Sequence, residues 1–288
     1  MGEADVGDGQ RLTLTGCDDN ELAATWWGQT TAPTILFLHG GGQTRHAWDA
    51  TARRLAGRGW RTVVVDQRGH GESAWTEVYG GDAFAGDVIA MVRQLGGRPI
   101  VVGASLGGIA ALLAQDIANQ DLCRAMVLVD IAPRTSRAGV ERILTFMKDG
   151  LAGFDSLEHA ADAVAGYVRE RERPKDVAGL RKKLRQRADG RWYWHWDPRA
   201  FEFEADDRRA AVARLEACAS RVEIPVLLVR GGRSDVIEAE HVKEFQRLVP
   251  HAGFVDVGGA GHMVAGDRND AFTDALIPFL DEQRSLTD

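Results

Sequence analysis

The sequence contains few cysteines, no long apolar run and fewer basic than acidic residues, and each of these shortages excludes a class of protein. Cys17, Cys123 and Cys218 are odd in number and far apart in the 288 residues, so we expect reduced, buried thiols and no disulfide framework. No stretch offers the roughly 18 unbroken apolar residues that a membrane-spanning helix needs. The shortages therefore disfavour a disulfide-rich, metal-binding or membrane-spanning protein.

The charge balance and the first residues bear on partners and location. A formal net charge of −7 disfavours nucleic-acid binding, which depends on Lys and Arg neutralising phosphates. The one basic run, RKKLRQR at 181–187, is interpreted as a solvated helix face, with steering of an anionic substrate as the alternative. MGEADVGDGQ at the start lacks the features of a signal peptide, so a cytoplasmic location is expected. Monomer and homodimer both stay open.

Short apolar runs bounded by turn residues recur along the chain. Their hydrophobicity is continuous rather than alternating, which is typical of strands covered on both faces in a parallel sheet. Two more runs near the N-terminus, at 12–15 and 22–27, are expected to add antiparallel strands at one edge. The central strands are predicted at 34–38, 62–65, 100–102, 126–129, 226–229 and 254–257.

Helical periodicity fills the segments between these runs, for example in Val242, Phe245 and Val249. Repeated strand and helix predict an α/β fold with a mostly parallel twisted sheet and helices on both faces. Between 134 and 223 the alternation stops, and this segment is interpreted as helices only. The sequence therefore predicts a core of 1–133 and 224–288, with a helical cap at 134–223 inserted after the sixth strand and lying over the carboxyl edge of the sheet.

The segment VVGASLGGIAAL at 101–112 predicts a nucleophile. A strand is followed by Gly103, Ala104, Ser105, Leu106 and Gly107, and then by a helix of small residues. A serine on such a tight turn adopts a strained backbone, and glycines two residues away on either side remove side chains that would collide there. The hydroxyl then projects at a helix N-terminus, where negative charge is stabilised.

The three glycines of HGGGQTRHAW, which follow the run TILFL, predict the matching oxyanion hole. A serine that attacks a carbonyl generates an oxyanion, and two backbone N–H groups aimed at one point stabilise it. Leu106 N–H is the first expected donor and Gly41 N–H is the second. Glycine at these positions lets the loop bend over the site without a Cβ in the way.

A serine hydroxyl needs a general base, and His262 is the best placed of the eight histidines. It follows the last predicted strand, and strand-end loops are where a sheet presents catalytic groups. His39 is expected to order its own loop, and His46 to start a helix, with substrate contact as the alternative. The other histidines are interpreted as surface or packing residues: His70, His159, His195, His241 and His251.

The acid that orients His262 is expected at another strand end, where two aspartates qualify. Asp235, in LLVRGGRSDVI, leaves room for one helix and one strand before the histidine. Asp130, which ends VLVD, would approach from a neighbouring strand. The spacing favours Asp235, so the predicted triad is Ser105, Asp235 and His262.

The chain resembles the α/β-hydrolase superfamily in five motifs that occur in the family's order. LHGGG resembles the oxyanion loop, DQRGHGES a structural turn packed under the site, GASLGG the nucleophile elbow, RGGRSD the acid loop and GAGHM the histidine loop. Serine at the elbow is similar to esterases, lactonases, C–C hydrolases and cofactor-free perhydrolases. The resemblance implies an acyl-enzyme mechanism that uses no metal and no cofactor.

The predicted cap carries a cluster of aromatic residues in GRWYWHWDPRAF at 190–201. If this segment is extended, its tryptophans share a face, which favours either an apolar substrate pocket or a small core within the cap. We predict a hydrolase of small, largely apolar esters or lactones, with C–C hydrolysis, perhydrolysis and a non-catalytic small-molecule receptor as alternatives. The predicted pocket residues are Gly42, His46, Trp192, Trp194, Trp196 and Met263.

Overall fold

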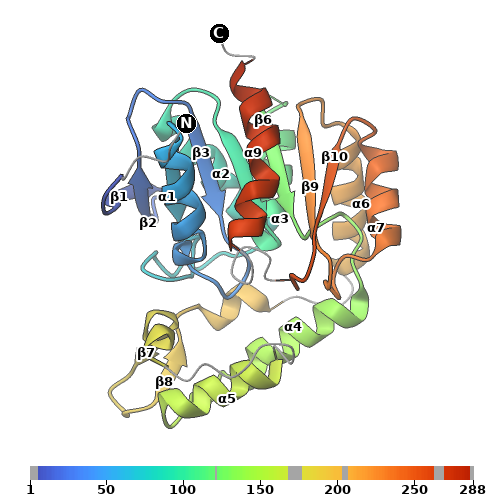
Figure 1. The fold of residues 1–288 in the computed structure, drawn as a ribbon. Coiled ribbons are helices and arrows are strands. Elements are labelled where there is room, and N and C mark those ends of the chain that lie inside the picture. Colours follow the sequence, from blue (N-terminus) through green and yellow to red (C-terminus); the bar gives the residue numbers. More distant parts are fainter. Residues whose placement is uncertain (1–5, 121, 168–176, 203–206, 263–268, 286–288) are drawn as a thin grey trace.

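A computed structural model describes residues 6–120, 122–167, 177–202, 207–262 and 269–285. Its centre is an eight-stranded sheet of order β1-β2-β4-β3-β5-β6-β9-β10 (Figure 1). The antiparallel N-terminal pair lies at one edge and the other neighbouring strands from β4 to β10 run parallel, as predicted. The strands are β1 (Gln10–Thr15), β2 (Glu21–Trp27), β3 (Thr34–Leu38), β4 (Arg61–Val65), β5 (Ile100–Ala104), β6 (Ala125–Val129), β9 (Val226–Gly231) and β10 (Gly253–Val257).

Helices cover both faces of this sheet because successive strand residues point in opposite directions. In β3, Leu36 and Leu38 belong to the cluster that packs under α2, α3, α6 and α7, whereas Ile35 and Phe37 pack against α1 and α9. All four side chains are fully buried. The helices are α1 (Asp49–Gly57), α2 (Gly81–Leu95), α3 (Leu106–Ile117), α6 (Asp207–Ser220), α7 (Ala239–Leu248) and α9 (Asn269–Ser285).

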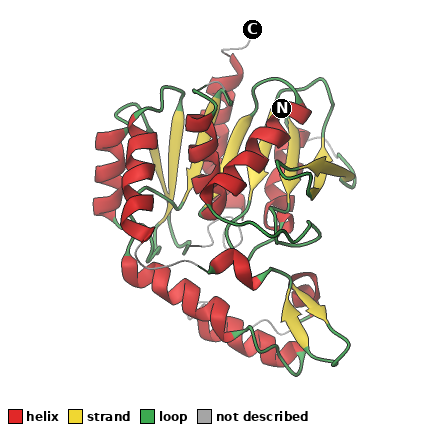
Figure 2. Ribbon diagram, turned by 180° about the vertical axis from the view of Figure 1, so that it is seen from behind, coloured by secondary structure: helices red, strands yellow, loops and turns green. Residues whose placement is uncertain are grey.

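A cap emerges after β6 and lies across one end of the sheet (Figures 1 and 2). It contains two helices, three-residue strands β7 and β8, and the short 3-10 helices η2 and η3. The aromatic segment thus forms a β-hairpin, in keeping with the strand preference of tryptophan and tyrosine. These elements are α4 (Arg137–Asp149), α5 (Leu157–Tyr167), η2 (Ala178–Lys183), β7 (Leu184–Gln186), β8 (Trp192–Trp194) and η3 (Pro198–Phe201).

Three sequence expectations about this region need correction. The segment 134–223 is not helical throughout, since β7 and β8 lie inside it. Its last helix, α6, packs against α3 and α7 of the core, although it also lines the cavity through Ala211, Val212 and Leu215, so the expected cap boundary at 223 is too late. The basic run 181–187 is divided between η2 and β7 and is not one helix face.

Two further features concern the cysteines and the apolar character of the helices. Cys123 and Cys218 are buried free thiols, as expected, whereas Cys17 is exposed. None of the helices in the described ranges combines the length and apolar character that crossing a bilayer requires.

Candidate active site

Ser105 lies in a strained turn between β5 and α3. Its φ of 45° and ψ of −112° fall outside the regions that L-residues favour, and its N–H is held by the Val129 carbonyl at 3.1 Å. The residue caps the N-terminus of α3, where the unpaired N–H groups of the first turn carry partial positive charge. The strain therefore coincides with a position suited to a nucleophile that develops negative charge nearby.

The flanking glycines are required by close backbone approaches. A Cβ on Gly103 would lie 2.5 Å from the carbonyl carbon of Gly107, and a Cβ on Gly107 would lie 2.5 Å from the Leu38 carbonyl oxygen. Both distances are far inside van der Waals contact, so α3 packs directly on the ends of β3 and β5. The sequence interpretation of these glycines agrees with this geometry.

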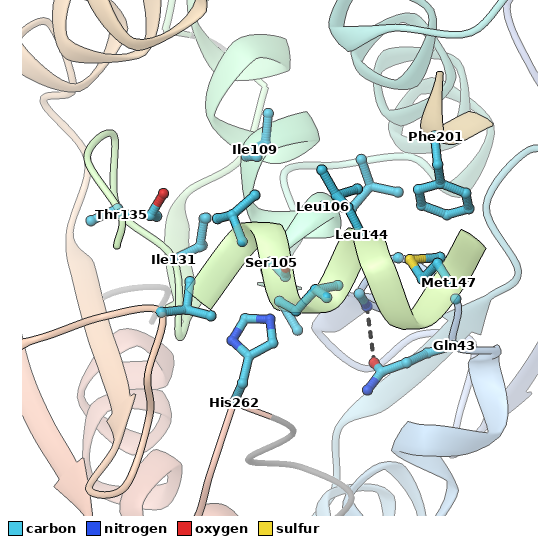
Figure 3. Close-up of a pocket in the computed structure, with 18 of the residues that line it drawn as sticks. Gln43, Ser105, Leu106, Ile109, Ile131, Thr135, Leu144, Met147, Phe201 and His262 are labelled. Carbon is cyan, nitrogen blue, oxygen red and sulfur yellow. Dashed lines mark hydrogen bonds between the residues drawn. The ribbon is translucent and has the colours of Figure 1, made fainter. Parts of the chain in front are cut away.

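His262 and Asp130 form a hydrogen-bonded pair beside Ser105. His262 Nδ1 lies 2.6 Å from Asp130 Oδ2, and the aspartate is fully buried. An ionised carboxylate only accepts hydrogen bonds, so Nδ1 carries the proton and Nε2 presents a lone pair. Figure 3 shows the His262 ring pointing toward Ser105, and both residues line one cavity.

Asp130 is fixed by its own backbone and by the loop after β9. Its φ of 51° is left-handed, and it turns the chain directly after β6. Oδ1 accepts the Gly231 N–H at 2.9 Å, while Oδ2 accepts the Ser234 hydroxyl at 2.5 Å in addition to His262. These donors hold the carboxylate in one orientation.

The predicted acid, Asp235, does not contact His262. Its carboxylate instead forms an ion pair with Arg142 of α4 at 2.5 Å and is one-third exposed. The expectation that Asp235 orients the histidine is therefore wrong for this structure. The preceding residue, Ser234, is the one that faces the site, and Asp130 occupies the position that spacing had assigned to Asp235.

The loop after β3 supplies the second half of the site. His39 donates Nδ1–H to the Gly40 carbonyl at 2.8 Å and accepts the Gln67 N–H at 3.0 Å, so it orders its own loop, as expected. Within the described residues, neither Gly41 N–H nor Leu106 N–H donates a hydrogen bond to another group. Both residues line the cavity beside Ser105, as an oxyanion hole requires.

Two histidines that were predicted to be surface or packing residues hold the loops next to the site by hydrogen bonds. His70 Nε2 accepts the Gly42 N–H at 3.1 Å, and its Nδ1–H donates to the Arg68 carbonyl. His195, from the cap, accepts the Gly71 N–H at 2.8 Å, so a hydrogen bond joins the cap to the DQRGHGES turn. The sequence feature that could have predicted a place for His70 near the site is its position within the DQRGHGES turn.

The cavity over Ser105 has a volume of about 650 Å³ and a mainly apolar wall. Trp194 and Trp196 stack with ring centroids 4.7 Å apart, and they both line the cavity and pack in the core of the cap. Gly42 lines it too, with a φ of 72° and the Trp196 ring close by. The apolar wall also includes Ile109, Ile131, Val140, Leu144, Met147 and Phe201.

The remaining predicted pocket residues fall elsewhere. His46 is exposed, pairs with Asp49 at 2.9 Å and belongs to η1, in agreement with a helix-start role and not with the pocket. Trp192 lies under the Arg181 guanidinium and does not line the cavity. Met263 lies outside the described residues. The pocket prediction is thus wrong for His46 and Trp192.

Comparison with known proteins shows the family to which the chain belongs. A family model described as alpha/beta hydrolase fold matches residues 33–268. The chain belongs to the α/β hydrolase family. Esterase Rv0045c of Mycobacterium tuberculosis is 30% identical to this α/β hydrolase over 90% of the chain and 86% of its own length. The mouse (Mus musculus) sn-1-specific diacylglycerol lipase ABHD11 is 28% identical over 88% of the chain and 82% of its own length.

Solved structures agree with this assignment. The crystal structure of E-2-(acetamidomethylene)succinate hydrolase superposes with a TM-score of 0.82 at 26% identity, covering 95% of this α/β hydrolase and all of the compared chain. The relatives are named esterases, lipases and hydrolases, so the coarse chemistry of the family is hydrolysis. The relatives' names do not specify which bond this hydrolase cleaves, and that question depends on the site.

The buried histidines of this α/β hydrolase predict a defined acid sensitivity. Burial lowers the pKa of His39, His70 and His195, and that of His70 falls to about 3. A histidine held neutral binds fewer protons when folded than when unfolded, so stability is lost as pH falls below the unfolded pKa of about 6.5. For His70, the free energy of unfolding is expected to fall by about 2 kcal/mol between pH 7 and pH 5.

Urea unfolding of the wild type and His70→Gln at pH 7 and pH 5 measures this effect. The variant is expected to be less stable at pH 7, because it loses well-placed hydrogen bonds, but to lose about 2 kcal/mol less on acidification. An equal loss in both proteins would show that His70 is not held neutral in the folded state.

Proposed function

We propose that this α/β hydrolase is a serine hydrolase that cleaves a carboxylic ester or lactone of a small, largely apolar substrate. The observation that carries the proposal is the hydrogen-bonded pair of His262 and Asp130 sharing one cavity with Ser105 on its strained turn. Nucleophile, base and orienting acid are the three parts that acyl transfer needs, and they occur here in the chain order serine, aspartate, histidine.

The first half-reaction forms an acyl-enzyme. His262 Nε2 accepts the proton of Ser105 Oγ as the oxygen attacks the substrate carbonyl carbon. The negative charge that develops on the carbonyl oxygen is stabilised by Gly41 N–H and Leu106 N–H, at the N-terminus of α3. The imidazolium then gives its proton to the alcohol oxygen as the ester C–O bond breaks, while the Asp130 carboxylate stabilises the imidazolium.

The second half-reaction returns the enzyme to its starting state. His262 takes a proton from water, the resulting hydroxide attacks the acyl carbon, and the same two N–H groups stabilise the second oxyanion. The proton then passes to Ser105 Oγ as the acid leaves. In a lactone the leaving alcohol remains attached to the acyl chain, so one product forms instead of two.

The wall of the cavity supports an apolar substrate. Aliphatic residues from α3, β6 and α4 face aromatic residues from the cap, and burial of a hydrocarbon chain among them contributes about 0.8 kcal/mol per methylene. A cavity of about 650 Å³ lies within the range of sites for small organic ligands. We therefore expect catalytic efficiency to rise with acyl length until the cavity is filled.

Steady-state kinetics with p-nitrophenyl esters of graded acyl length and with simple lactones test the proposal. The wild type is expected to show a clear optimum in kcat/KM, and intact-protein mass spectrometry after a rapid acid quench is expected to find one acyl group on Ser105. Absence of turnover across the whole panel would refute ester and lactone hydrolysis. Peroxide-dependent and C–C bond assays would then test the alternatives.

A further inference from the structure

Gln43 carries a polar side chain that lines the cavity beside Ser105 and that the mechanism does not use. It lies in the loop after β3 and lines the cavity together with Gly40, Gly41 and Ser105. Figure 3 shows Gln43 on one side of Ser105 and His262 on the other. The other side chains labelled there are apolar except for Thr135, so a polar group at this place needs an explanation.

The hydrogen bonds of the loop fix which end of the Gln43 amide faces Gly40. Gly40 N–H donates to Gln43 Oε1 at 3.0 Å, and Gln43 N–H donates to the Gly40 carbonyl at 3.1 Å. Because only the oxygen of an amide accepts, Oε1 must face Gly40 and the NH₂ group must point away from it. Among the described residues, none accepts a hydrogen bond from Nε2.

The amide lies close to the nucleophile. A Cβ placed on Gly40 would be 3.3 Å from Gln43 Oε1 and 3.5 Å from Ser105 Cβ, so both groups border the same small volume. The Gln43 amide therefore lies next to the place where a substrate carbonyl would meet Ser105. Its two N–H donors have no partner among the described residues, so they are available to an acceptor on a ligand.

The sheet order indicates which part of the substrate meets this donor. Strand β5, which carries Ser105, lies between β3 and β6. His262 is held by Asp130 at the end of β6, and it must protonate the leaving alcohol, so the alcohol lies on the β6 side. Gln43 follows β3 on the opposite side and therefore faces the acyl group.

We propose that Gln43 Nε2 binds a hydrogen-bond-accepting oxygen, such as an ether, hydroxyl or keto oxygen, in the acyl chain close to the scissile carbonyl. This inference rests on the proposed ester hydrolysis and narrows its substrate class. The preferred acyl groups are oxygen-substituted near the carbonyl and apolar beyond it, because most of the remaining wall is apolar.

Isosteric acyl pairs measure this selectivity directly. The probes are p-nitrophenyl 3-methoxypropanoate with pentanoate, and p-nitrophenyl methoxyacetate with butanoate, in which an oxygen replaces one methylene. The measured quantity is kcat/KM for the oxygen-containing ester divided by kcat/KM for its hydrocarbon counterpart. For at least one pair, this ratio is expected to be about tenfold lower in Gln43→Met than in the wild type, because the variant loses a single hydrogen bond. Any general damage to the loop affects both members of a pair and cancels in the ratio.

Two further variants separate the donor from the loop contact. Gln43→Glu retains an oxygen for Gly40 N–H but has no NH₂ group, and it is expected to lower the same ratio at least as far. Thr135→Val removes a hydroxyl from the β6 side, and its ratio is expected to stay within about twofold of the wild type. Circular dichroism and thermal unfolding confirm that each variant is folded.

The outcomes of these assays distinguish the role of Gln43 from the proposed ester hydrolysis on which it rests. Ser105-dependent hydrolysis of pentanoate and butanoate, with ratios unchanged in Gln43→Met for both pairs, would overturn the role of Gln43 and leave ester hydrolysis standing. Failure of the wild type to hydrolyse any of the four esters would overturn ester hydrolysis, and the role of Gln43 with it.

Discussion

Replacement of Ser105 by alanine is expected to lower kcat/KM for the best ester of the panel by about 10⁴-fold or more, with the fold intact. The variant loses the hydroxyl oxygen that the proposed mechanism uses to form the acyl-enzyme and that the strained turn positions. Residual turnover above the uncatalysed rate is expected, because the Gly41 and Leu106 N–H groups still stabilise an oxyanion.

Ser136→Ala is the matched control for this experiment. Ser136 caps α4, accepting the Gly139 N–H at 3.3 Å, and it does not line the cavity. Its removal is expected to cost about 1 kcal/mol of stability and to leave kcat/KM within about threefold of the wild type. Turnover that survives in Ser105→Ala at near wild-type rates would exclude a serine nucleophile in this site.

Replacement of Asp130 by asparagine is expected to lower kcat by about 10³- to 10⁴-fold, whereas the same change at Asp235 is expected to alter it by less than about threefold. Asparagine at 130 keeps the shape of the side chain but removes the charge that stabilises the imidazolium. An amide NH₂ facing Nδ1 also favours the wrong tautomer of His262, with the proton on Nε2.

The two aspartates serve as controls for each other because both follow strands of the same half of the sheet. Asp235→Asn loses only a partly exposed ion pair to Arg142, which is worth at most about 1 kcal/mol. The measurement is kcat for one ester across pH 5 to 9 in both variants. A large loss in Asp235→Asn with near-normal kcat in Asp130→Asn would restore the assignment that linear spacing favoured.

The sequence was sufficient for the features that depend on local pattern. Continuous apolar runs such as 34–38 and 226–229 identified the buried strands, because strands covered on both faces have no polar side. The spacing of glycines around Ser105 predicted the strained turn, since only glycine tolerates the backbone approaches found at Gly103 and Gly107. These are properties of residues that are close together in the chain.

The cap shows where local pattern was insufficient. The segment after residue 183 has no long alternating pattern, and three-residue strands are too short to produce one. Trp192 and Trp194 form a strand because their rings pack against the helices of the cap and against Trp196. Tertiary packing of aromatic rings, and not backbone preference alone, selected the hairpin.

The sequence by itself determined the sheet and the ordering role of His39, and it predicted the nucleophile and the histidine loop. Only the tertiary structure decided between Asp130 and Asp235, and it brought His70 and Gln43 to the site. The physical reason is that spacing along a chain limits which loop reaches the site but not the direction of a carboxylate within it. That direction follows from the left-handed backbone of Asp130, from the donors Gly231 and Ser234 that hold it, and from the cap arginine that draws Asp235 away.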